Sequence, residues 1–381
     1  MRILFRGHVH GADGAGSDGA DGVLVEGETI TWVGRGRPPE RPDEEVVAAP
    51  GEVIAPGFID LQVNGFGGHD VAAGAEAIAA VSEALPATGV TAFLPTLISA
   101  PVEVGAAFTA AVGAAAEAQG SRVLGAHVEG PFLNPSFRGA HLRSHLAEPT
   151  VDNVDAVLAA RPRLVTLAPE LPGALLAIER MHRAGIVVAA GHTGADYEQG
   201  RKAISAGVRF ATHVYNAMPP VHHRRPGIAL ALLLDPRVVT GLIADGEHVH
   251  PAMCEQLIRV KGASRIALTT DQTSAAGAPP GSYSLSGRSV VSDGRVVRLE
   301  DGTLAGSAAT MPDLVRLMAR TAGVGPSRAI TLASAVPARV LGERRLGRIT
   351  AGACADLVVL DADLRVRLTM VRGVVKFRRS F

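Results

Sequence analysis

From Pro56 to Asp271, apolar runs of strand length alternate with alanine-rich segments of helical spacing. Because the alternation occurs eight times and parallel strands need covering crossover helices, it predicts a (β/α)₈ barrel, an α/β fold. The predicted strands are Phe58–Asn64, Thr91–Thr96, Val123–Glu129, Leu164–Glu170, Ile186–His192, Phe210–Asn216, Val238–Asp245 and Ile266–Asp271. The alternative is an open doubly wound sheet, but no Gly-x-Gly-x-x-Gly turn follows the first strand.

Both ends of the chain have a different pattern, with short apolar strands separated by turns rich in Gly and Asp. We predict that residues 1–54 and 344–381 pair into one small β-sandwich, and that residues 55–343 form the barrel. Residues 272–304 are rich in Gly, Ser and Pro, and we expect a loop or hairpin over the barrel mouth. The sequence predicts two further helices, Met311–Thr321 and Pro326–Leu341.

The composition excludes several classes of protein. Lys+Arg and Asp+Glu both number 37, so the chain has no net field that attracts nucleic acid or an anionic membrane. No uninterrupted apolar stretch is long enough to predict a membrane span, and the N-terminus lacks the apolar run of a signal peptide. Two cysteines are too few for a disulfide framework or a Cys-rich zinc site. We therefore expect a soluble cytoplasmic protein.

Two histidines follow consecutive predicted strands. His192 and His213 each close a short apolar run, and the segment between them has helical spacing. A βαβ unit of this length places the two strands side by side, so both imidazoles should project from one rim. A single such histidine is more often a hydrogen-bonded core residue. A pair at strand ends, with Asp271 ending a later strand, favours a shared metal ion.

Glu129 completes a possible ligand set. It ends the third predicted strand, where chemistry concentrates in barrel enzymes. Glu129, His192 and His213 supply one oxygen and two nitrogens, which suits zinc with an open position for water. Asp271 could take a proton from that water and return it to the leaving group, although it could also be a capping residue. The set predicts a metal-assisted hydrolase.

Two weaker candidates follow these strands. His141 ends Arg-Gly-Ala-His (138–141) and could polarise a substrate carbonyl, although a surface histidine is an equally good interpretation. The loop after His213 contains His222, His223, Arg224 and Arg225. Such a basic loop suits a phosphate or a carboxylate, and the alternative is a solvated loop.

Nine short motifs follow one another along the chain. They are Pro-Gly-Phe-Ile-Asp-Leu-Gln-Val-Asn-Gly (56–65), His-Val-Glu-Gly-Pro-Phe-Leu-Asn (127–134), Arg-Gly-Ala-His (138–141), Leu-Ala-Pro-Glu (167–170), Gly-His-Thr (191–193), Thr-His-Val-Tyr-Asn-Ala-Met (212–218), Ala-Asp-Gly-Glu-His-Val (244–249), Thr-Thr-Asp (269–271) and Leu-Ala-Gly-Ser (304–307). In this order they resemble the amidohydrolase superfamily and, within it, the N-acetylglucosamine-6-phosphate deacetylase family. The resemblance covers nearly the whole chain, including the split β-sandwich.

The resemblance implies a role for each reactive residue. Glu129, His192 and His213 would bind the metal, and Asp271 would act as general base and then general acid. His141 would help to hold the acetyl carbonyl. The expected reaction converts N-acetylglucosamine 6-phosphate to glucosamine 6-phosphate and acetate, in amino-sugar catabolism or cell-wall recycling.

The resemblance also implies how the sugar phosphate binds. Asn216, Ala217, His141 and His248 would contact the substrate, and Arg224 would reach across a homodimer interface into the neighbouring site. Two positions depart from the family pattern and bear on substrate preference. They are Arg225, where an acidic residue is common, and Gln272, where alanine is common.

The first and fourth strands bear on the number of metal ions. Many superfamily members hold two metals with His-x-His on the first strand and a carboxylated lysine on the fourth. Here the positions of His-x-His on the first strand are occupied by Gln62-x-Asn64. The fourth predicted strand ends in Glu170, with no lysine near it. Because a neutral amide is a poor ligand for Zn²⁺, we expect one divalent ion per subunit. Zinc is the expected metal, with Fe²⁺, Mn²⁺ and Co²⁺ as alternatives.

Three other functions compete with the leading hypothesis. The first is deacetylation of the galactosamine epimer. The second is another amidohydrolase activity, such as that of a cyclic amidase or an isoaspartyl dipeptidase, but those enzymes normally keep the paired histidines or the lysine. The third is a catalytically inactive barrel that serves as a scaffold or sensor. The intact set of Glu129, His192, His213 and Asp271 argues against the third.

Overall fold

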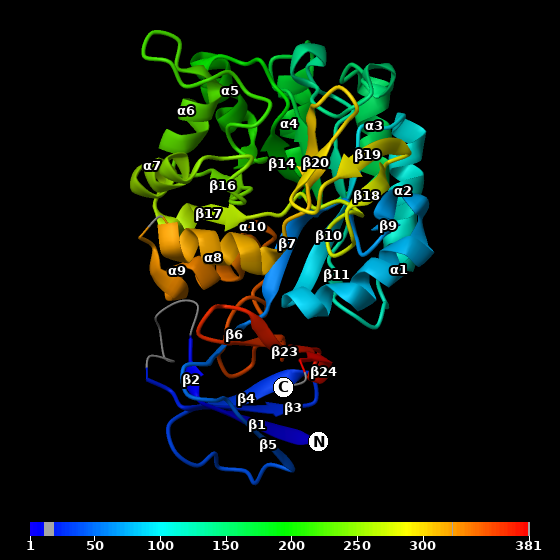
Figure 1. Cartoon of the computed structure of the whole chain (residues 1–381). Helices are drawn as coiled ribbons and strands as arrows, with labels where there is room; N and C mark the ends of the chain where they lie inside the picture. The colour runs from blue at the N-terminus through cyan, green and yellow to red at the C-terminus, as the bar shows by residue number, and fades with distance from the viewer. Residues whose placement is uncertain (11–18, 322, 380–381) are drawn as a thin grey trace.

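The computed structural model describes residues 1–10, 19–321 and 323–379. Eight parallel strand positions form a nearly closed barrel, which confirms the predicted fold class (Figure 1). The strands are β7 (Phe58–Val63), β10 (Val90–Ile98), β11 (Arg122–Val123) continued by β12 (His127–Glu129), β13 (Leu164–Leu167), β14 (Val187–Ala190), β15 (Val208–Ala211), β16 (Val239–Leu242) and β17 (Ile266–Leu268). The third position is split because Gly125 interrupts it with a φ of 120°.

The barrel closes between its first and last strands through few contacts. Instead of a regular ladder between β7 and β17, a parallel bridge joins Val63 to Gln272. The Asn64 backbone N–H donates to the Gln272 backbone carbonyl at 2.8 Å. Below this bridge, the Asp60 carboxylate accepts a hydrogen bond from the Thr270 hydroxyl at 2.5 Å. Side chains therefore complete the closure next to Asp271.

Helices cover the outside of the barrel (Figure 1). In α4, the buried residues Ala174, Ala177, Ile178 and Met181 recur at helical spacing, so one face packs on the sheet. Helix α5 begins with a capping box between Asp196 and Gln199. The helices are α1 (Ala75–Ala84), α2 (Val102–Ala114), α3 (Val151–Ala160), α4 (Ala174–Arg183), α5 (Tyr197–Ala206), α6 (Gly227–Leu234), α7 (Pro251–Lys261) and α8 (Met311–Thr321). Among the described helices, none combines the length and apolar character needed to cross a membrane.

The two chain ends form a small β-sandwich, as predicted. One sheet has the order β4-β3-β1-β5, and the other has the order β2-β6-β22-β23-β24. Apolar side chains from both sheets, such as Phe5, Ile30, Leu357 and Met370, form one buried cluster between them. The strands are β1 (Arg2–Arg6), β2 (His8–Val9), β3 (Gly22–Glu26), β4 (Thr29–Gly34), β5 (Glu44–Val47), β6 (Val53–Pro56), β22 (Leu357–Leu360), β23 (Val366–Val371) and β24 (Val374–Arg378).

The boundary between the sandwich and the barrel falls within almost continuous strand. Strand β6 ends at Pro56, and β7 starts at Phe58. A split between residues 54 and 55 therefore remains a prediction, as does the split between 343 and 344.

The segment after the last barrel strand forms another small sheet beside the carboxyl end of the barrel, which we call the mouth sheet. Its antiparallel strands are β18 (Gly281–Leu285), β19 (Arg288–Ser292), β20 (Val296–Arg298) and β21 (Leu304–Ser307), and β8 (Gly65–Phe66) pairs separately with β9 (His69–Asp70). Helix α8 has the predicted bounds, but the predicted helix Pro326–Leu341 is two helices, α9 (Gly325–Ala333) and α10 (Ala335–Val340). The break lies at Ser334, whose φ of −130° and ψ of −77° are not helical.

Most predicted barrel strands extend beyond the observed carboxyl ends. Strand β13 ends at Leu167 rather than Glu170, and β17 ends at Leu268 rather than Asp271. Beyond three of these strands, β14, β15 and β17, the backbone turns at His192, His213 and Asp271, which have positive φ angles of 48°, 29° and 49°. A left-handed residue cannot continue a strand, so the chain turns where the polar residues begin.

Candidate active site

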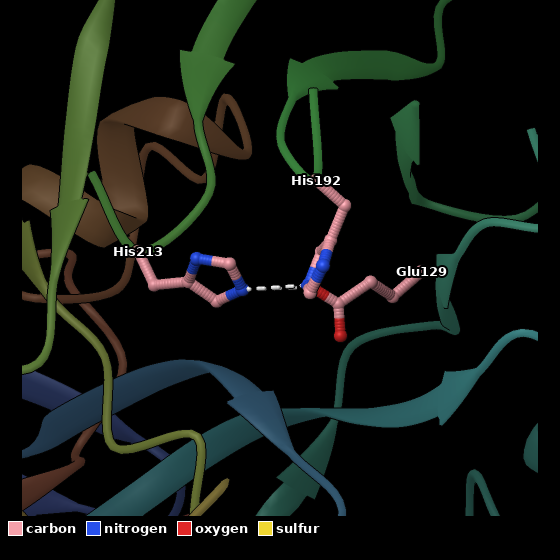
Figure 2. A group of neighbouring side chains, drawn as sticks. All are labelled: Glu129, His192 and His213. Atoms are coloured by element: carbon pink, nitrogen blue, oxygen red, sulfur yellow. Dashed lines mark hydrogen bonds and ion pairs between the residues drawn. The ribbon is translucent and has the colours of Figure 1, made fainter. Parts of the chain in front are cut away.

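Glu129, His192 and His213 meet above the carboxyl end of the barrel (Figure 2). Glu129 ends β12, while His192 and His213 each lie two residues beyond their strands, β14 and β15. The Nε2 atoms of the two histidines are 3.1 Å apart. Glu129 Oε1 lies 3.3 Å from His192 Nε2 and 3.1 Å from His213 Nε2. The structure thus brings the three predicted ligands into one compact triangle.

The donor atoms of this triangle suit a cation. His192 Nδ1 lies 2.9 Å from the Phe137 carbonyl, which cannot donate, so Nδ1 carries the proton and Nε2 presents a lone pair. Glu129 Oε1 and this lone pair of His192 thus face each other in a buried place, with His213 Nε2 as the third potential ligand atom. Ligands about 2.0–2.1 Å from a tetrahedral zinc ion would be about 3.3 Å apart, close to the separations found here. The residues present fit a divalent metal.

Asp271 lies beside this triangle, three residues beyond β17. Its side chain is buried, and Oδ1 accepts a hydrogen bond from Asn64 Nδ2 at 2.7 Å. Burial and then the charge of Glu129 raise the pKa of Asp271 to about 6. A carboxyl group with such a pKa can both take and release a proton near neutral pH.

His141 lies on the other side of Glu129, with its tautomer fixed by Ser99. The Ser99 backbone N–H donates to His141 Nδ1 at 3.0 Å, so the ring proton lies on Nε2. Nε2 is 3.7 Å from Glu129 Oε2. Burial and then the charge of His192 lower the pKa of His141 to about 4, so the ring is neutral at pH 7. A neutral Nε2–H donor suits a substrate carbonyl oxygen.

All of the predicted site residues except Arg224 line one cavity of about 390 Å³. Leu285 and Leu304 of the mouth sheet form part of its wall, together with Ile98. The cavity therefore combines an ionisable floor with an apolar side.

His248 enters this cavity from the loop after β16. Asp245 Oδ2 lies 2.7 Å from His248 Nδ1, which leaves Nε2 available to a bound molecule. Although burial opposes it, the contact with His248 lowers the pKa of Asp245. Asn216 and Ala217 come from the turn after His213, where Ala217 has a φ of 50°. Asn216 Nδ2 donates to the His213 carbonyl at 3.2 Å and so stabilises this turn.

Arg224 lies apart from the metal triangle within one subunit. It is exposed and lines a separate cavity of about 770 Å³, together with Arg225 and the start of α5. The structure of one chain thus does not bring Arg224 to the reactive residues. Its predicted role across a dimer interface stays a prediction.

Glu170 has a role that the sequence did not reveal. Its carboxylate accepts hydrogen bonds from Asn134 Nδ2 at 2.8 Å, from Thr193 Oγ1 at 2.5 Å and from the Gly194 backbone at 2.6 Å. It thereby joins the loop after Glu129 to the turn after His192. The sequence showed a carboxylate at a predicted strand end, within the motif Leu-Ala-Pro-Glu (167–170), but not its partners.

The sequence profile of the amidohydrolase family matches residues 53–376. The chain belongs to the amidohydrolase family. Family members among its relatives include N-acetylglucosamine-6-phosphate deacetylase of Bacillus subtilis (strain 168), which is 36% identical and is aligned over 93% of this chain and 92% of the relative. N-acetylgalactosamine-6-phosphate deacetylase of Escherichia coli O157:H7 is 38% identical over 84% of this chain and 87% of the relative.

A solved structure is similar over the same range. It is an aspartate-to-alanine mutant of N-acetyl-D-glucosamine-6-phosphate deacetylase from Mycobacterium smegmatis, in complex with N-acetyl-D-glucosamine 6-phosphate. The two chains superpose with a TM-score of 0.90 at 33% identity, over 99% of each. The similarity thus includes the barrel and the small β-sandwich.

Proposed function

We propose that this amidohydrolase hydrolyses the acetamide of N-acetylglucosamine 6-phosphate to give glucosamine 6-phosphate and acetate. The observation that carries the proposal is the buried triangle of Glu129, His192 and His213, with Asp271 and His141 around one cavity. Relatives that span nearly the whole chain are deacetylases of amino-sugar 6-phosphates. An inactive scaffold would have no need of this arrangement.

Glu129 Oε1 and the Nε2 atoms of His192 and His213 would hold one divalent ion per subunit. Imidazole and carboxylate ligands favour zinc, and Fe²⁺, Mn²⁺ and Co²⁺ share this chemistry. When bound, such an ion supplies Lewis acidity that lowers the pKa of water to about 7 and polarises a carbonyl.

Two residues would move or hold protons around the scissile bond. The Asp271 carboxylate takes a proton from the attacking water and delivers it to the amine nitrogen as the C–N bond breaks. Without that proton, the amine would have to leave as a strongly basic anion. His141 donates from Nε2 to the acetyl oxygen and stabilises the negative charge that develops there.

The rest of the cavity would bind the sugar phosphate. His248, Asn216 and Ala217 lie at the same rim as the reactive residues. We propose that Arg224 supplies a guanidinium to the phosphate of the neighbouring subunit, which requires a homodimer. A charged sugar phosphate does not cross a bilayer unaided, so we place the enzyme with its substrate in the cytoplasm.

A panel of N-acetyl sugars tests this function. Purified protein should release acetate from N-acetylglucosamine 6-phosphate much faster than from unphosphorylated N-acetylglucosamine. No release from any phosphorylated N-acetylhexosamine would contradict the proposal.

The galactosamine epimer is a second candidate substrate, because the E. coli relative acts on N-acetylgalactosamine 6-phosphate by its name. The two sugars differ only in the orientation of the C4 hydroxyl. The ratio of their kcat/KM values in the same panel decides between them.

The role of Arg224 can be measured separately. Arg224→Ala should raise KM for the phosphorylated sugar far more than for the unphosphorylated analogue, because only the former has the anion. Arg259→Ala removes another exposed arginine, on α7, and serves as the control. Equal effects of Arg224→Ala on both sugars would argue against a phosphate contact.

A further inference from the structure

Gln62 and Asn64 occupy the end of the first barrel strand, directly below the reactive residues. Both are about 1% exposed, so two neutral amides are buried in the centre of the fold. Burying an amide is unfavourable unless its polar atoms form hydrogen bonds. Their burial therefore points to specific partners.

Each amide has a different acidic partner. Gln62 Nε2 donates to Glu129 Oε2 at 3.2 Å, whereas Asn64 Nδ2 donates to Asp271 Oδ1 at 2.7 Å. The carbonyl oxygens of both amides have no hydrogen-bond partner among the described residues. An ionised carboxylate only accepts hydrogen bonds, so each amide must present its NH₂ group to the acid.

Gln62 and the two histidines contact different oxygens of Glu129. Oε1 of Glu129 lies within 3.3 Å of both His192 Nε2 and His213 Nε2. Oε2 accepts from Gln62 at 3.2 Å and lies 3.7 Å from His141 Nε2, so Gln62 is its nearer partner. The hydrogen bond to Oε2 resists rotation of the carboxylate. It thus keeps one oxygen directed at the ligand triangle.

Asn64 contacts both the backbone and the side chain of Asp271. The Asp271 backbone is left-handed, and its carbonyl accepts from the Ser307 backbone N–H at 2.9 Å. Asn64 Nδ2 also lies 3.4 Å from that carbonyl and engages Oδ1 of the side chain. Oδ2 is then the oxygen available for proton transfer.

We propose that Gln62 and Asn64 are positioning residues with separate tasks: Gln62 orients the metal ligand Glu129, and Asn64 orients the general base Asp271. The task of Asn64 rests on the proposed function, since it requires Asp271 to act in the reaction. The task of Gln62 depends only on metal binding.

The two nearly isosteric variants Gln62→Met and Asn64→Leu test the separation. Metal affinity is measured by competition with a chelator, and kcat and KM are measured at saturating metal. Gln62→Met should weaken metal binding by about 10-fold or more, as expected for loss of a partner of a metal ligand. Asn64→Leu should lower kcat by about 10-fold, while its metal affinity and KM change less than twofold.

A double-mutant cycle shows whether Asn64 acts through Asp271. In an Asp271→Asn background, Asn64→Leu should lower kcat by less than twofold, because the base that Asn64 orients has already been removed. Thr269→Val is the matched control, since it removes a buried hydroxyl two residues from Asp271 that has no partner among the described residues. It should change neither metal affinity nor kcat appreciably.

Several outcomes would overturn the proposal. One is that both variants weaken metal binding equally, and another is that Asn64→Leu costs as much in the Asp271→Asn background as in the wild type. If a variant does not fold, as judged by its melting transition, Gln62→Ala or Asn64→Ala takes its place. Wild-type protein that binds metal but deacetylates no sugar phosphate would refute the proposed function, while the metal affinity of Gln62→Met would still decide the task of Gln62.

Discussion

The two ends of the barrel are built from the same strands but have opposite interiors. At the amino end, Leu94, Ala189 and Phe210 form part of an apolar cluster that Leu341 and Leu346 close from below. At the carboxyl end, the interior consists of buried amides, imidazoles and carboxylates. The interior of the barrel thus changes from a packed apolar core to a buried polar site within a few residues of each strand.

The backbone differs between the two ends as well. His192, His213 and Asp271 follow their strands in left-handed conformations. Each such residue costs of the order of 1–3 kcal/mol, so the surrounding structure must hold it in place. The comparison indicates that apolar packing at the amino end stabilises the fold, and that this stability offsets the backbone strain at the carboxyl end.

The largest expected effect concerns the carboxyl end. His213→Asn should lower kcat/KM by at least about 10³-fold, because an amide is a poor zinc ligand and the Lewis acid is lost. Asparagine tolerates a positive φ, so the turn should remain folded. Elemental analysis should find one ion per subunit in the wild type and little in the variant. Two fully occupied ions in the wild type would contradict the single-metal site.

Asp271→Asn should slow the chemical step without affecting metal binding. It keeps the size of the side chain and removes the base, so kcat should fall by at least about 10²-fold while the metal stays bound. Rate measurements with parallel metal analysis check this. Near wild-type kcat, or loss of the metal, would mean that Asp271 is a structural or ligand carboxylate instead.

The amino end should show the reverse pattern. Ile59 is buried in the apolar cluster, so Ile59→Val should lower the free energy of unfolding by about 0.5–1.5 kcal/mol. The value of kcat/KM should stay within twofold of the wild type. Urea unfolding and the acetate assay measure the two quantities, and a large loss of activity would show that the two ends are coupled.

Lys261 offers the smallest and most specific test, because it is a buried cation that does not line the cavity of the site. Its Nζ donates to the carbonyls of Leu232 and Asp235, both at 2.6 Å, and burial lowers the pKa of Lys261 to about 8. Between about pH 8 and the usual lysine pKa of 10.5, the unfolded chain binds more protons than the folded one, so stability should rise with pH.

Lys261→Met should remove this rise. The full shift would correspond to about 3 kcal/mol, but the two carbonyl acceptors favour the charged amine, so we expect a rise on the order of 1 kcal/mol. The measurement is the difference in unfolding free energy between wild type and variant across this pH range. A difference that does not depend on pH would show that the lysine is not desolvated.

The sequence predicted the barrel and the candidate metal ligands because both follow from repeated local patterns, whereas Asn216, Ala217 and His248 came only from the family resemblance. Strand-length runs gave the fold, and the polar residue after each run gave Glu129, His192 and His213. It predicted the end of the third strand at Glu129 but not the ends of most others, since the left-handed turn at His213 depends on packing rather than on residue preference.

Local sequence patterns also could not predict the contacts between loops that are distant in the sequence. The Ser99 amide fixes the tautomer of His141 across 42 positions. Glu170 joins Asn134 to Thr193 although all three are far apart in the chain. These contacts exist only once the barrel has brought the strand ends together.

The pairing of β6 with β22 has a consequence for how the protein is made. Residues Val53–Pro56 lie antiparallel to Leu357–Leu360, so the first sheet partner emerges from the ribosome long before the second. Until then β6 has an unpaired edge on that side, next to the first barrel strand. Since unpaired edges invite association with other chains, nascent chains that stall before Leu357 should be more prone to aggregation than released ones.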